Sequence, residues 1–327
     1  MSSVNKIAVM TSGGDAPGMN AAIRAIARAC QYYNHQCIAV IQGFEGLING
    51  HFKELDARGV RNIINRGGTI LKSARCKEFR TVEGRKKAWE NVQKHNIDGL
   101  IIIGGDGSLT GGMIFQSEYG LPVVGIPGTI DNDIYGTSRA IGFDTAVNTV
   151  VEAVDKIRDT ASSHNRLFFI EVMGRDAGHI ALNAGIAAGA EEILIPEQDD
   201  GIDSLIRTLK YGKKSGKSSS IVVVAEGDKT RDNVFNLASQ IREELPEYDV
   251  RVSVLGHIQR GGRPTYYDRV LASRMGIYSV EILREGKSNV MIGVDLDKLI
   301  LTPLKDAVKG KSAINKNMVR ISKILSV

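Results

Sequence analysis

Short apolar runs alternate with longer helical segments along most of this 327-residue chain, and this alternation constrains the fold more than any other feature. Each apolar run has the length and composition of a buried strand. Strands are expected at residues 7–10, 37–41, 99–103, 123–126, 167–172, 221–224 and 251–255. Helices are expected at residues 21–33, 84–95, 145–160, 177–188, 234–244 and 267–284. Strands that alternate with helices predict an α/β protein with mostly parallel sheets flanked by helices.

Glycines directly follow three of the expected strands, at residues 13–14, 104–105 and 174. In open parallel sheets, ligands bind beyond the carboxyl ends of the strands. Glycine lets the backbone approach a ligand closely, and a helix that starts next to it offers free N–H groups to an anion. These three loops are therefore the first candidates for a binding site.

Residues 11–20 (TSGGDAPGMN) form the first of these loops and lead into an alanine-rich helix. The segment matches neither the Walker A pattern nor the Rossmann fingerprint, although paired glycines before a helix suit a phosphate. The alternative is a tight strand-to-helix turn with Asp15 as a cap. From this segment alone, both interpretations stay open.

Two further loops carry carboxylates. Residues 104–108 (GGDGS) allow close phosphate contact, and Asp106 could hold a Mg²⁺ ion that bridges phosphates. Lipid kinases and NAD kinases share this motif, so it indicates phosphoryl transfer without identifying the acceptor. In residues 127–133 (PGTIDND), Asp131 could accept a proton from a hydroxyl while Asp133 supports a metal or water. The same residues are also ordinary turn formers.

Several arginines lie beside glycine or in expected loops, among them Arg75, Arg166, Arg175 and Arg260. The planar guanidinium group donates two hydrogen bonds at once and therefore suits phosphate. A single surface arginine is usually only solvated, and His257 alone would more often be structural than a ligand. Several such residues at strand ends together favour a phosphorylated small molecule as substrate.

The composition points to the same class of ligand. The formal net charge is +5, but Lys and Arg are scattered among acidic residues, and we interpret the densest cluster, residues 85–87, as a solvated helix face. No nucleic-acid or membrane partner is therefore expected. Three cysteines without metal-ligand spacing and an N-terminus without signal-peptide features predict a cytoplasmic protein.

Taken together, these segments resemble the signature segments of bacterial-type ATP-dependent 6-phosphofructokinases, in order and in spacing. The segments that carry the resemblance are residues 11–20, 65–69, 104–108, 127–133, 172–175 and 256–262. The resemblance covers about residues 7–285 and implies two αβ domains. Residues 1–141 and 256–306 would bind ATP, and residues 142–255 and 307–327 would bind fructose phosphate. The implied reaction is the glycolytic phosphorylation of fructose 6-phosphate at its 1-hydroxyl, in a homotetramer.

The resemblance implies a role for individual residues. Those expected to contact ATP are Gly14, Arg75, Cys76, Gly105, Asp106, Gly107 and Ser108, with Asp106 also on Mg²⁺. The expected catalytic residues are Asp131, which would take the proton from the 1-hydroxyl, and Thr129 and Arg175, which would orient the reacting groups. Those expected to hold the sugar phosphate are Thr129, Ile130, Asp131, Met173, Gly174, Arg175, Glu226, His257, Ile258, Gln259 and Arg260. Arg166 and Arg251 would reach its 6-phosphate from a neighbouring subunit.

Two alternatives share this fold. Pyrophosphate-dependent relatives typically carry Asp where Gly107 stands and Lys where Gly128 stands, so the two glycines favour ATP. A non-catalytic nucleotide or sugar-phosphate sensor would not need Asp106, Asp131 and Arg175 together. Lys72 is a local difference, because many bacterial members have glycine before the Ser-Ala-Arg sequence.

The resemblance also implies a second, regulatory site between subunits, where ADP activates and phosphoenolpyruvate inhibits. The residues that match it are Arg24, Arg28, Arg158, Gly189, Glu191 and Lys217. The arginine expected directly after Asp56 is displaced to Arg58, and Lys217 is the clearest match in a loop that is rich in lysine in the family. We therefore expect an effector site that binds anions weakly.

Overall fold

The computed structural model describes residues 4–162, 166–198, 201–217, 219–228 and 233–326. The chain forms two compact units. The first comprises Met1–Ile130, Ile134–Thr145 and Arg260–Ser312, and the second comprises Asp131–Asp133, Ala146–Gln259 and Ala313–Val327. The assignment of ATP to one unit and sugar phosphate to the other stays a prediction.

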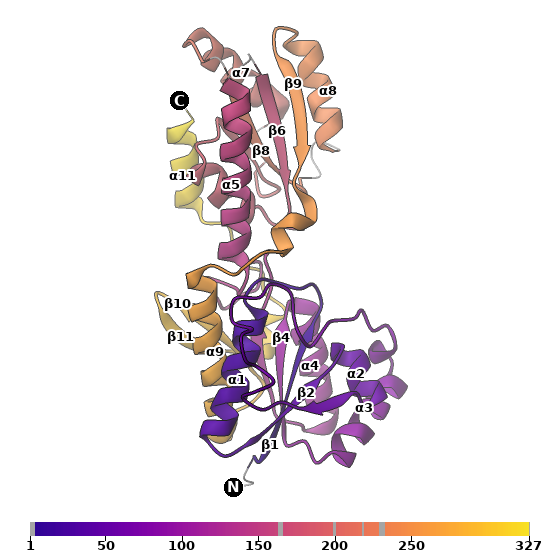
Figure 1. Cartoon of the computed structure of the whole chain (residues 1–327). Helices are drawn as coiled ribbons and strands as arrows, with labels where there is room; N and C mark the ends of the chain where they lie inside the picture. Colours follow the sequence, from indigo (N-terminus) through magenta and orange to yellow (C-terminus); the bar gives the residue numbers. More distant parts are fainter. Residues whose placement is uncertain (1–3, 163–165, 199–200, 218, 229–232, 327) are drawn as a thin grey trace. The chain divides into compact units, whose positions relative to one another are not determined.

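The first unit is built on a seven-stranded sheet with the order β11-β10-β5-β4-β1-β2-β3 (Figure 1). Its strands are β1 (Lys6–Ser12), β2 (Gln36–Val40), β3 (Phe52–Glu54), β4 (Gly99–Gly104), β5 (Val123–Pro127), β10 (Val290–Asp295) and β11 (Lys298–Pro303). The five central strands are parallel, and the two edge strands, β3 and β11, pair antiparallel with their neighbours. The predicted α/β class with a mostly parallel sheet is confirmed.

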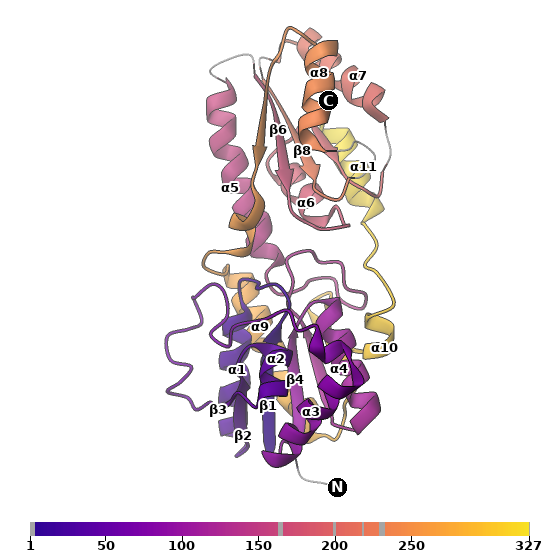
Figure 2. The ribbon, with the colours of Figure 1, turned by 90° about the vertical axis from the view of Figure 1, so that its right-hand side faces the viewer.

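Helices cover both faces of this sheet because its central strands are apolar on both sides; every residue of β4 is buried. The helices of the unit are α1 (Met19–Tyr32), α2 (Gly43–Asn49), α3 (Val82–Lys94), α4 (Asp106–Tyr119), α9 (Tyr266–Arg284) and α10 (Leu304–Ala307). Helices α1 and α9 lie together on one face, and α3 and α4 on the other (Figure 2). Gly276 of α9 permits the close approach, since a Cβ atom there would lie 2.8 Å from the carbonyl oxygen of Ala22.

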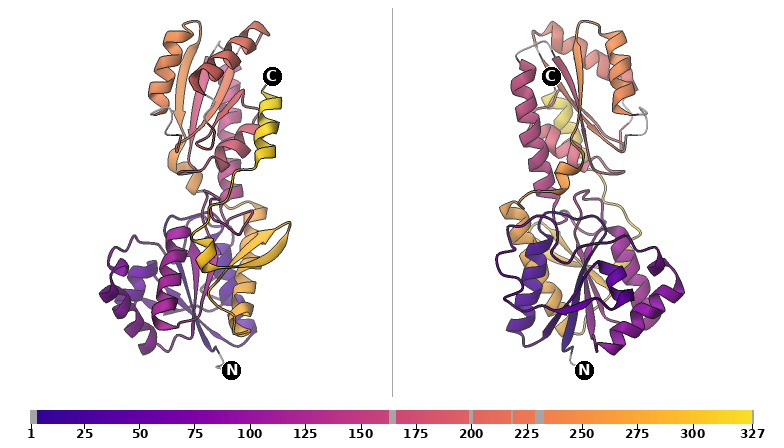
Figure 3. Two further views of the ribbon diagram at one scale, coloured as in Figure 1. Left: turned by 180° about the vertical axis from the view of Figure 1, so that it is seen from behind. Right: turned by 45° about the vertical axis from the view of Figure 1, so that its right-hand side comes forward.

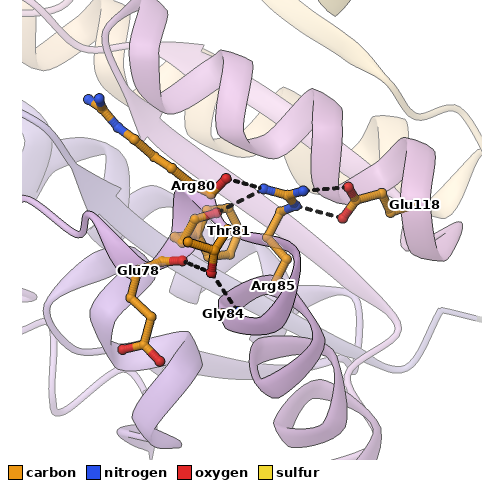
Figure 4. A network of polar contacts seen from close by, with 7 residues as sticks. Glu78, Arg80, Thr81, Gly84, Arg85 and Glu118 are labelled. Carbon is orange, nitrogen blue, oxygen red and sulfur yellow. Dashed lines mark hydrogen bonds and ion pairs between the residues drawn. The ribbon is translucent and has the colours of Figure 1, made fainter.

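The interpretation of residues 85–87 as a solvated face is wrong for Arg85. Its side chain is buried, and its guanidinium group donates to both carboxylate oxygens of Glu118 on α4, at 2.6 and 2.7 Å (Figure 4). It also donates to the carbonyl oxygens of Phe79, at 3.2 Å, and Arg80, at 2.8 Å. Lys86 and Lys87 are exposed as expected. Arg85 therefore ties the short 3-10 turn Glu78–Arg80 to α4.

The second unit is built on a four-stranded sheet with the order β7-β8-β6-β9, all parallel. Its strands are β6 (Arg166–Val172), β7 (Glu192–Leu194), β8 (Ser220–Ala225) and β9 (Asp249–Val254). Its helices are α5 (Phe143–Ser162), α6 (His179–Ala187), α7 (Gly201–Lys214), α8 (Val234–Glu244) and α11 (Lys316–Leu325). Helices α7 and α8 pack on one face of the sheet, over Phe169 and Val222. Helix α5 lies on the opposite face (Figure 3).

Candidate active site

In the first unit, the loops at residues 13–14, 104–108 and 127–130 meet at one edge of the sheet, whereas Gly174 belongs to the second unit. Strands β1, β4 and β5 are parallel neighbours, and their last residues, Ser12, Gly104 and Pro127, are in register. Because each loop leaves its strand at the carboxyl end, the loops lie side by side. The sequence placed each loop after a strand, and the structure makes the three strands adjacent.

The segment from Gly104 to Ser108 turns directly from β4 into α4. A Cβ atom at Gly104 would lie 2.5 Å from the carbonyl oxygen of Ser12, so only glycine fits there. Ser108 is buried, whereas Asp106 and Gly107 are exposed in the first turn of α4. The start of a helix attracts anions because its first N–H groups and its dipole point outwards. The segment can therefore present a helix start and one carboxylate to a phosphate and its metal ion.

Two buried polar residues of the first loop hold a second loop in place. Thr11 shares a hydrogen bond of 2.9 Å with Thr69 and donates to the carbonyl oxygen of Lys72, also at 2.9 Å. Asn20 accepts from the backbone N–H of Ile70 at 2.8 Å. These bonds fix the segment that leads to Arg75, whose side chain is exposed. No separate role for Thr11 or Asn20 was expected from the sequence, because their partners lie about 50 or more residues away.

The backbone explains why glycine suits position 72. Lys72 has a φ angle of 59°, in the left-handed region that side chains disfavour and glycine adopts freely. Its side chain is exposed. Lysine in place of the glycine that many family members have at this position is therefore a matter of backbone conformation.

Arg260 lies against the first glycine loop. It donates to the carbonyl oxygen of Asp15 at 3.4 Å, and a Cβ atom at Gly14 would lie 2.5 Å from its Nη1. The resemblance gives Gly14 to ATP and Arg260 to the sugar phosphate, and the structure brings the two residues together. A cation next to this loop can neutralise charge that both substrates bring.

The loop after β5 buries its central residues. The backbone N–H of Gly128 donates to Gly104 at 3.0 Å, and that of Thr129 donates to Ile141 at 3.1 Å. Thr129, Ile130 and Asp131 are all buried, with Thr129 and Asp131 each 7% exposed. The hydroxyl and carboxylate thus occupy defined positions, as a catalytic threonine and a proton acceptor require.

In the second unit, Glu226 organises the loop that follows β6. Its Oε1 accepts the backbone N–H groups of Gly174, at 3.3 Å, and Arg175, at 2.8 Å. Both residues have positive φ angles, 146° and 57°. Such a conformation is costly for arginine and is typical of functional loops. The loop presents the Arg175 side chain to the outside, where it is 62% exposed.

The short helix after β9, Gly256–Arg260, contains four expected substrate residues with different exposures; Arg260 is described above. His257 and Ile258 are exposed. Gln259 is fully buried; its amide nitrogen donates to Gly256 at 3.0 Å, and its oxygen accepts the N–H of Met173 at 3.1 Å. The Gln259 side chain therefore supports the loop that carries Met173 and is not itself open to a ligand.

Arg166 and Arg251 lie at the opposite edge of the second sheet. Arg166 is the first residue of β6, while Met173 and Arg175 follow its last residue, Val172. A strand rises about 3.3 Å per residue, so the two ends of β6 are roughly 20 Å apart. Arg251 lies opposite Phe168, about 13 Å along the sheet from Val172. Both arginines therefore lie toward the end of the sheet away from Arg175.

The expected effector residues fall in both units. In the second unit, Arg158 donates to the carbonyl oxygens of Ala188 and Gly189, both at 2.8 Å, and lies 3.8 Å from a carboxylate oxygen of Glu191. Lys217 is half-buried; Ser218, next to it, lies outside the described residues.

In the first unit, α1 presents the half-buried Arg24 and the exposed Arg28, and the loop after β3 presents the exposed Arg58. Partial burial, together with the neighbouring charge of Arg28, lowers the pKa of Arg24. Two arginines of one helix thus place like charges close together, which favours an anion beside them.

Comparison with known proteins identifies the family. The phosphofructokinase family pattern matches residues 6–283. The chain belongs to the phosphofructokinase family. It is 52% identical, over the full length of both proteins, to the ATP-dependent 6-phosphofructokinase 2 of Bacteroides thetaiotaomicron. It is also 52% identical to the ATP-dependent 6-phosphofructokinase 1 of Thermus thermophilus, over 99% of this chain and 100% of that one.

A solved structure supports the same assignment of the fold. The phosphofructokinase of Saccharomyces cerevisiae superposes with a TM-score of 0.88 at 37% identity, over 98% of this chain. The match covers 47% of the yeast chain, so this phosphofructokinase spans about half the length of that relative. None of the helices that the structure describes is both long and apolar enough to cross a membrane.

Proposed function

We propose that this phosphofructokinase transfers the γ-phosphoryl group of ATP to the 1-hydroxyl of fructose 6-phosphate, giving fructose 1,6-bisphosphate and ADP in glycolysis. The observation that carries the proposal is the convergence of three glycine loops at the carboxyl ends of β1, β4 and β5. Full-length relatives at 52% identity that are named ATP-dependent 6-phosphofructokinases support it.

The first unit supplies the ATP site in this proposal. The contacts come from the loop around Gly14, from Arg75 and Cys76, and from residues 105–108 at the start of α4. Arg75 is exposed and can neutralise the triphosphate.

The residues present also fit a Mg²⁺ ion. Mg²⁺ binds proteins through one or two carboxylates and completes its shell with phosphate oxygens and water, and the exposed Asp106 fits that mode. Within the described part of the chain, no group of three metal-ligating side chains offers an alternative cage. When bound, the ion would neutralise charge on the phosphates.

Asp131 is the proton acceptor in the proposed mechanism. Asp131 is buried and follows Thr129 by two residues, so the carboxylate and the hydroxyl belong to the same loop. Arg175 is held at its backbone by Glu226 and can orient the transferring phosphoryl group. Phosphoryl transfer depends on positioning and charge neutralisation, so these residues need to hold the reactants in line more than to react with them.

The sugar-phosphate site is completed by a second chain in this proposal. Met173, Gly174, Arg175 and Glu226 meet at the carboxyl edge of the second sheet. Arg166, about 20 Å away along β6, and Arg251 on the neighbouring β9, about 13 Å away, would instead serve the site of a neighbouring subunit. A homo-oligomer, a tetramer in this family, would follow from that arrangement.

Space around Gly107 favours ATP over pyrophosphate as donor. A Cβ atom at Gly107 would meet nothing within 4 Å, so the chain leaves room beside the phosphate loop for the rest of a nucleotide. At Gly128, a Cβ atom would lie 3.0 Å from Ile103 and 3.1 Å from Met19, so a lysine there would require these side chains to shift. The open space that suits the larger donor is therefore at Gly107, whereas Gly128 packs against the protein's own side chains.

A coupled assay tests the proposal. Purified enzyme is supplied with fructose 6-phosphate and either ATP or pyrophosphate, and ADP or phosphate release is followed together with fructose 1,6-bisphosphate. We expect turnover with ATP and at least a hundredfold less with pyrophosphate, roughly the loss that removing one stabilising interaction of the transition state causes. Comparable turnover with pyrophosphate would favour the alternative donor. No turnover with either donor, although both substrates bind, would favour the sensor.

We also propose a weak effector site between subunits. It would use Arg24, Arg28, Arg58, Arg158 and Lys217, with Gly189 and Glu191 on the metal side of its loop. Arg24 and Arg28 are four residues apart on α1 and so share one side of that helix, which supports an anion there. ADP and phosphoenolpyruvate are titrated at subsaturating fructose 6-phosphate. Small shifts of half-saturation at high effector concentration are expected. Strong responses at low concentration would contradict the weak site.

A further inference from the structure

Asp249 lies between the two arginines that are proposed to bind the sugar's 6-phosphate. Strands β6 and β9 are parallel, and their register sets Arg166 opposite Asp249 and Phe168 opposite Arg251. Residues two apart on a strand share a face of the sheet, so all three charged side chains stand on the same face at the start of the two strands. Val250, between the two charged residues of β9, is buried on the other face.

A single carboxylate oxygen joins the two arginines. Oδ2 of Asp249 accepts from Nε of Arg166 at 3.1 Å and from Nη2 of Arg251 at 3.0 Å. Each guanidinium group has five N–H donors, so most donors of both arginines remain available to another anion. The shared oxygen therefore brings the two guanidinium groups together and leaves most of their N–H donors free to bind a phosphate.

We infer that Asp249 is a positioning residue for fructose 6-phosphate binding: it holds Arg166 and Arg251 in the orientation that grips the 6-phosphate. The inference rests on the proposed function, in which these two arginines contact that phosphate. Without the shared oxygen, the two arginine side chains would lose their common partner. Long exposed side chains also lose conformational entropy when a ligand orders them, and an existing anchor reduces that cost.

A role in stability does not explain the cluster. The three side chains are 26% (Arg166), 45% (Asp249) and 55% (Arg251) exposed, and exposed ion pairs of this kind contribute little to folding. The hydrogen bond from Arg251, with a smaller effect of Arg166, lowers the pKa of Asp249. The carboxylate is therefore ionised wherever the enzyme would work, and its hydrogen bonds persist at neutral pH.

The test compares two variants of Asp249 with one matched control. Asp249→Ala removes the shared oxygen, Asp249→Asn keeps an oxygen of the same reach without the charge, and Glu247→Ala removes a nearby exposed acid that pairs with Lys213. Asp249→Ala should raise the KM for fructose 6-phosphate about three- to tenfold, the usual effect of one hydrogen bond. The KM for ATP and kcat should stay at the wild-type values. Asp249→Asn and Glu247→Ala should leave all three constants within about twofold of wild type.

Three outcomes would overturn the inference. An unchanged KM in Asp249→Ala would show that the arginines need no anchor. A lowered KM would show that the carboxylate competes with the phosphate. Equal increases in Asp249→Ala and Asp249→Asn would show that charge, and not the shared acceptor, matters.

Two further measurements separate this inference from the proposed function. A wild-type enzyme without activity on fructose 6-phosphate refutes the proposed function itself. An active wild type in which Arg166→Ala and Arg251→Ala leave that KM unchanged refutes the phosphate assignment, and the role of Asp249 with it. Circular dichroism of each variant verifies folding, which these exposed positions should not affect.

Discussion

Thr145 donates its hydroxyl hydrogen to Oδ2 of Asp268 over 2.5 Å, and the same carboxylate accepts the backbone N–H groups of Gly142 and Thr145, both at 2.9 Å. Asp268 belongs to α9 and is fully buried. Its carboxylate thus caps the first turn of α5 from another helix. Burial raises the pKa of Asp268 to about 6, although the three hydrogen bonds act in the opposite direction.

The first prediction is a pH dependence of stability that comes from Asp268. Its folded pKa of about 6 lies above the ordinary value of 3.8, so the folded state binds more protons than the unfolded state between these values. Protonation of Asp268 therefore stabilises the folded state fully below pH 3.8. This stabilisation, about 3 kcal/mol, is lost as the pH rises through 6. Urea unfolding of wild type and Asp268→Asn at several pH values tests this. The unfolding free energy of wild type minus that of Asp268→Asn should fall between pH 4 and pH 7. A difference that is constant with pH would contradict the prediction.

The second prediction concerns the ion pair between the buried Arg85 and the partly exposed Glu118. Arg85→Ala leaves Glu118 without its partner and frees two carbonyl oxygens of the Glu78–Arg80 turn, so the free energy of unfolding should fall by about 2–3 kcal/mol. Lys87→Ala is the control on the same helix, because it removes only an exposed pair with Glu78. Thermal unfolding of both variants gives the comparison. Equal shifts of Tm in the two variants would show that burial of the pair is irrelevant.

The third prediction concerns Asp131 as the proton acceptor. Asp131→Ser should lower kcat by roughly 10²–10⁴-fold, the usual scale for the loss of a general base. The KM values should change less, because the proton moves in the transition state. Steady-state kinetics of the purified variant tests this expectation. A kcat close to wild type would exclude the role.

The fourth prediction concerns the choice of donor. Gly107→Asp should fold normally, since a side chain there meets no protein atom within 4 Å at its Cβ. Its carboxylate beside the phosphates should lower kcat/KM for ATP about tenfold or more, equivalent to ~1.4 kcal/mol of charge repulsion.

Adding Gly128→Lys should worsen ATP use further, because Ile103 and Met19 must move to admit it. Unaffected ATP kinetics in the double variant would show that neither glycine selects the donor.

The fifth prediction follows from the position of Arg251 at the amino edge of β9. Arg251→Ala chains should raise the KM for fructose 6-phosphate far more than that for ATP. When they are co-assembled with Asp131→Ser chains, some sites receive an intact Asp131 from one chain and an intact Arg251 from the other. Hybrid oligomers should therefore recover part of the wild-type activity. Verified hybrids without recovery would place both residues in the same chain's site.

Much of the site was accessible from the sequence because its glycine loops directly follow apolar strands. A buried strand such as β4 reveals itself as a continuous apolar run, and its loop begins where the run ends. The adjacency of β1, β4 and β5 was not visible, since strand order depends on long-range pairing. The burial of Arg85 was missed for the same reason, because its partner, Glu118, lies 33 residues away in the sequence. A cluster of cationic residues on a helix predicts a solvent-exposed face when such a partner is not known.

The antiparallel pair of β10 and β11 shows another limit. Its two-residue turn consists of Leu296 and Asp297, which both adopt positive φ angles, 44° and 64°. Hairpins with this backbone usually carry Asn-Gly or Asp-Gly, and that signal is missing here. The sequence analysis therefore predicted no strand beyond residue 285, although the apolar stretch at β10 is buried in the sheet.

The length of β6 has a consequence for how the enzyme behaves when it is scarce. This one strand separates Arg166 from Arg175, so on the proposed assembly a lone chain would carry two halves of different substrate sites and no complete one. On the proposed assembly, dilution that dissociates the oligomer removes sugar-phosphate affinity from every chain at once. Specific activity would then fall steeply below a threshold enzyme concentration, and saturating fructose 6-phosphate, which bridges two chains, would shift that threshold downwards.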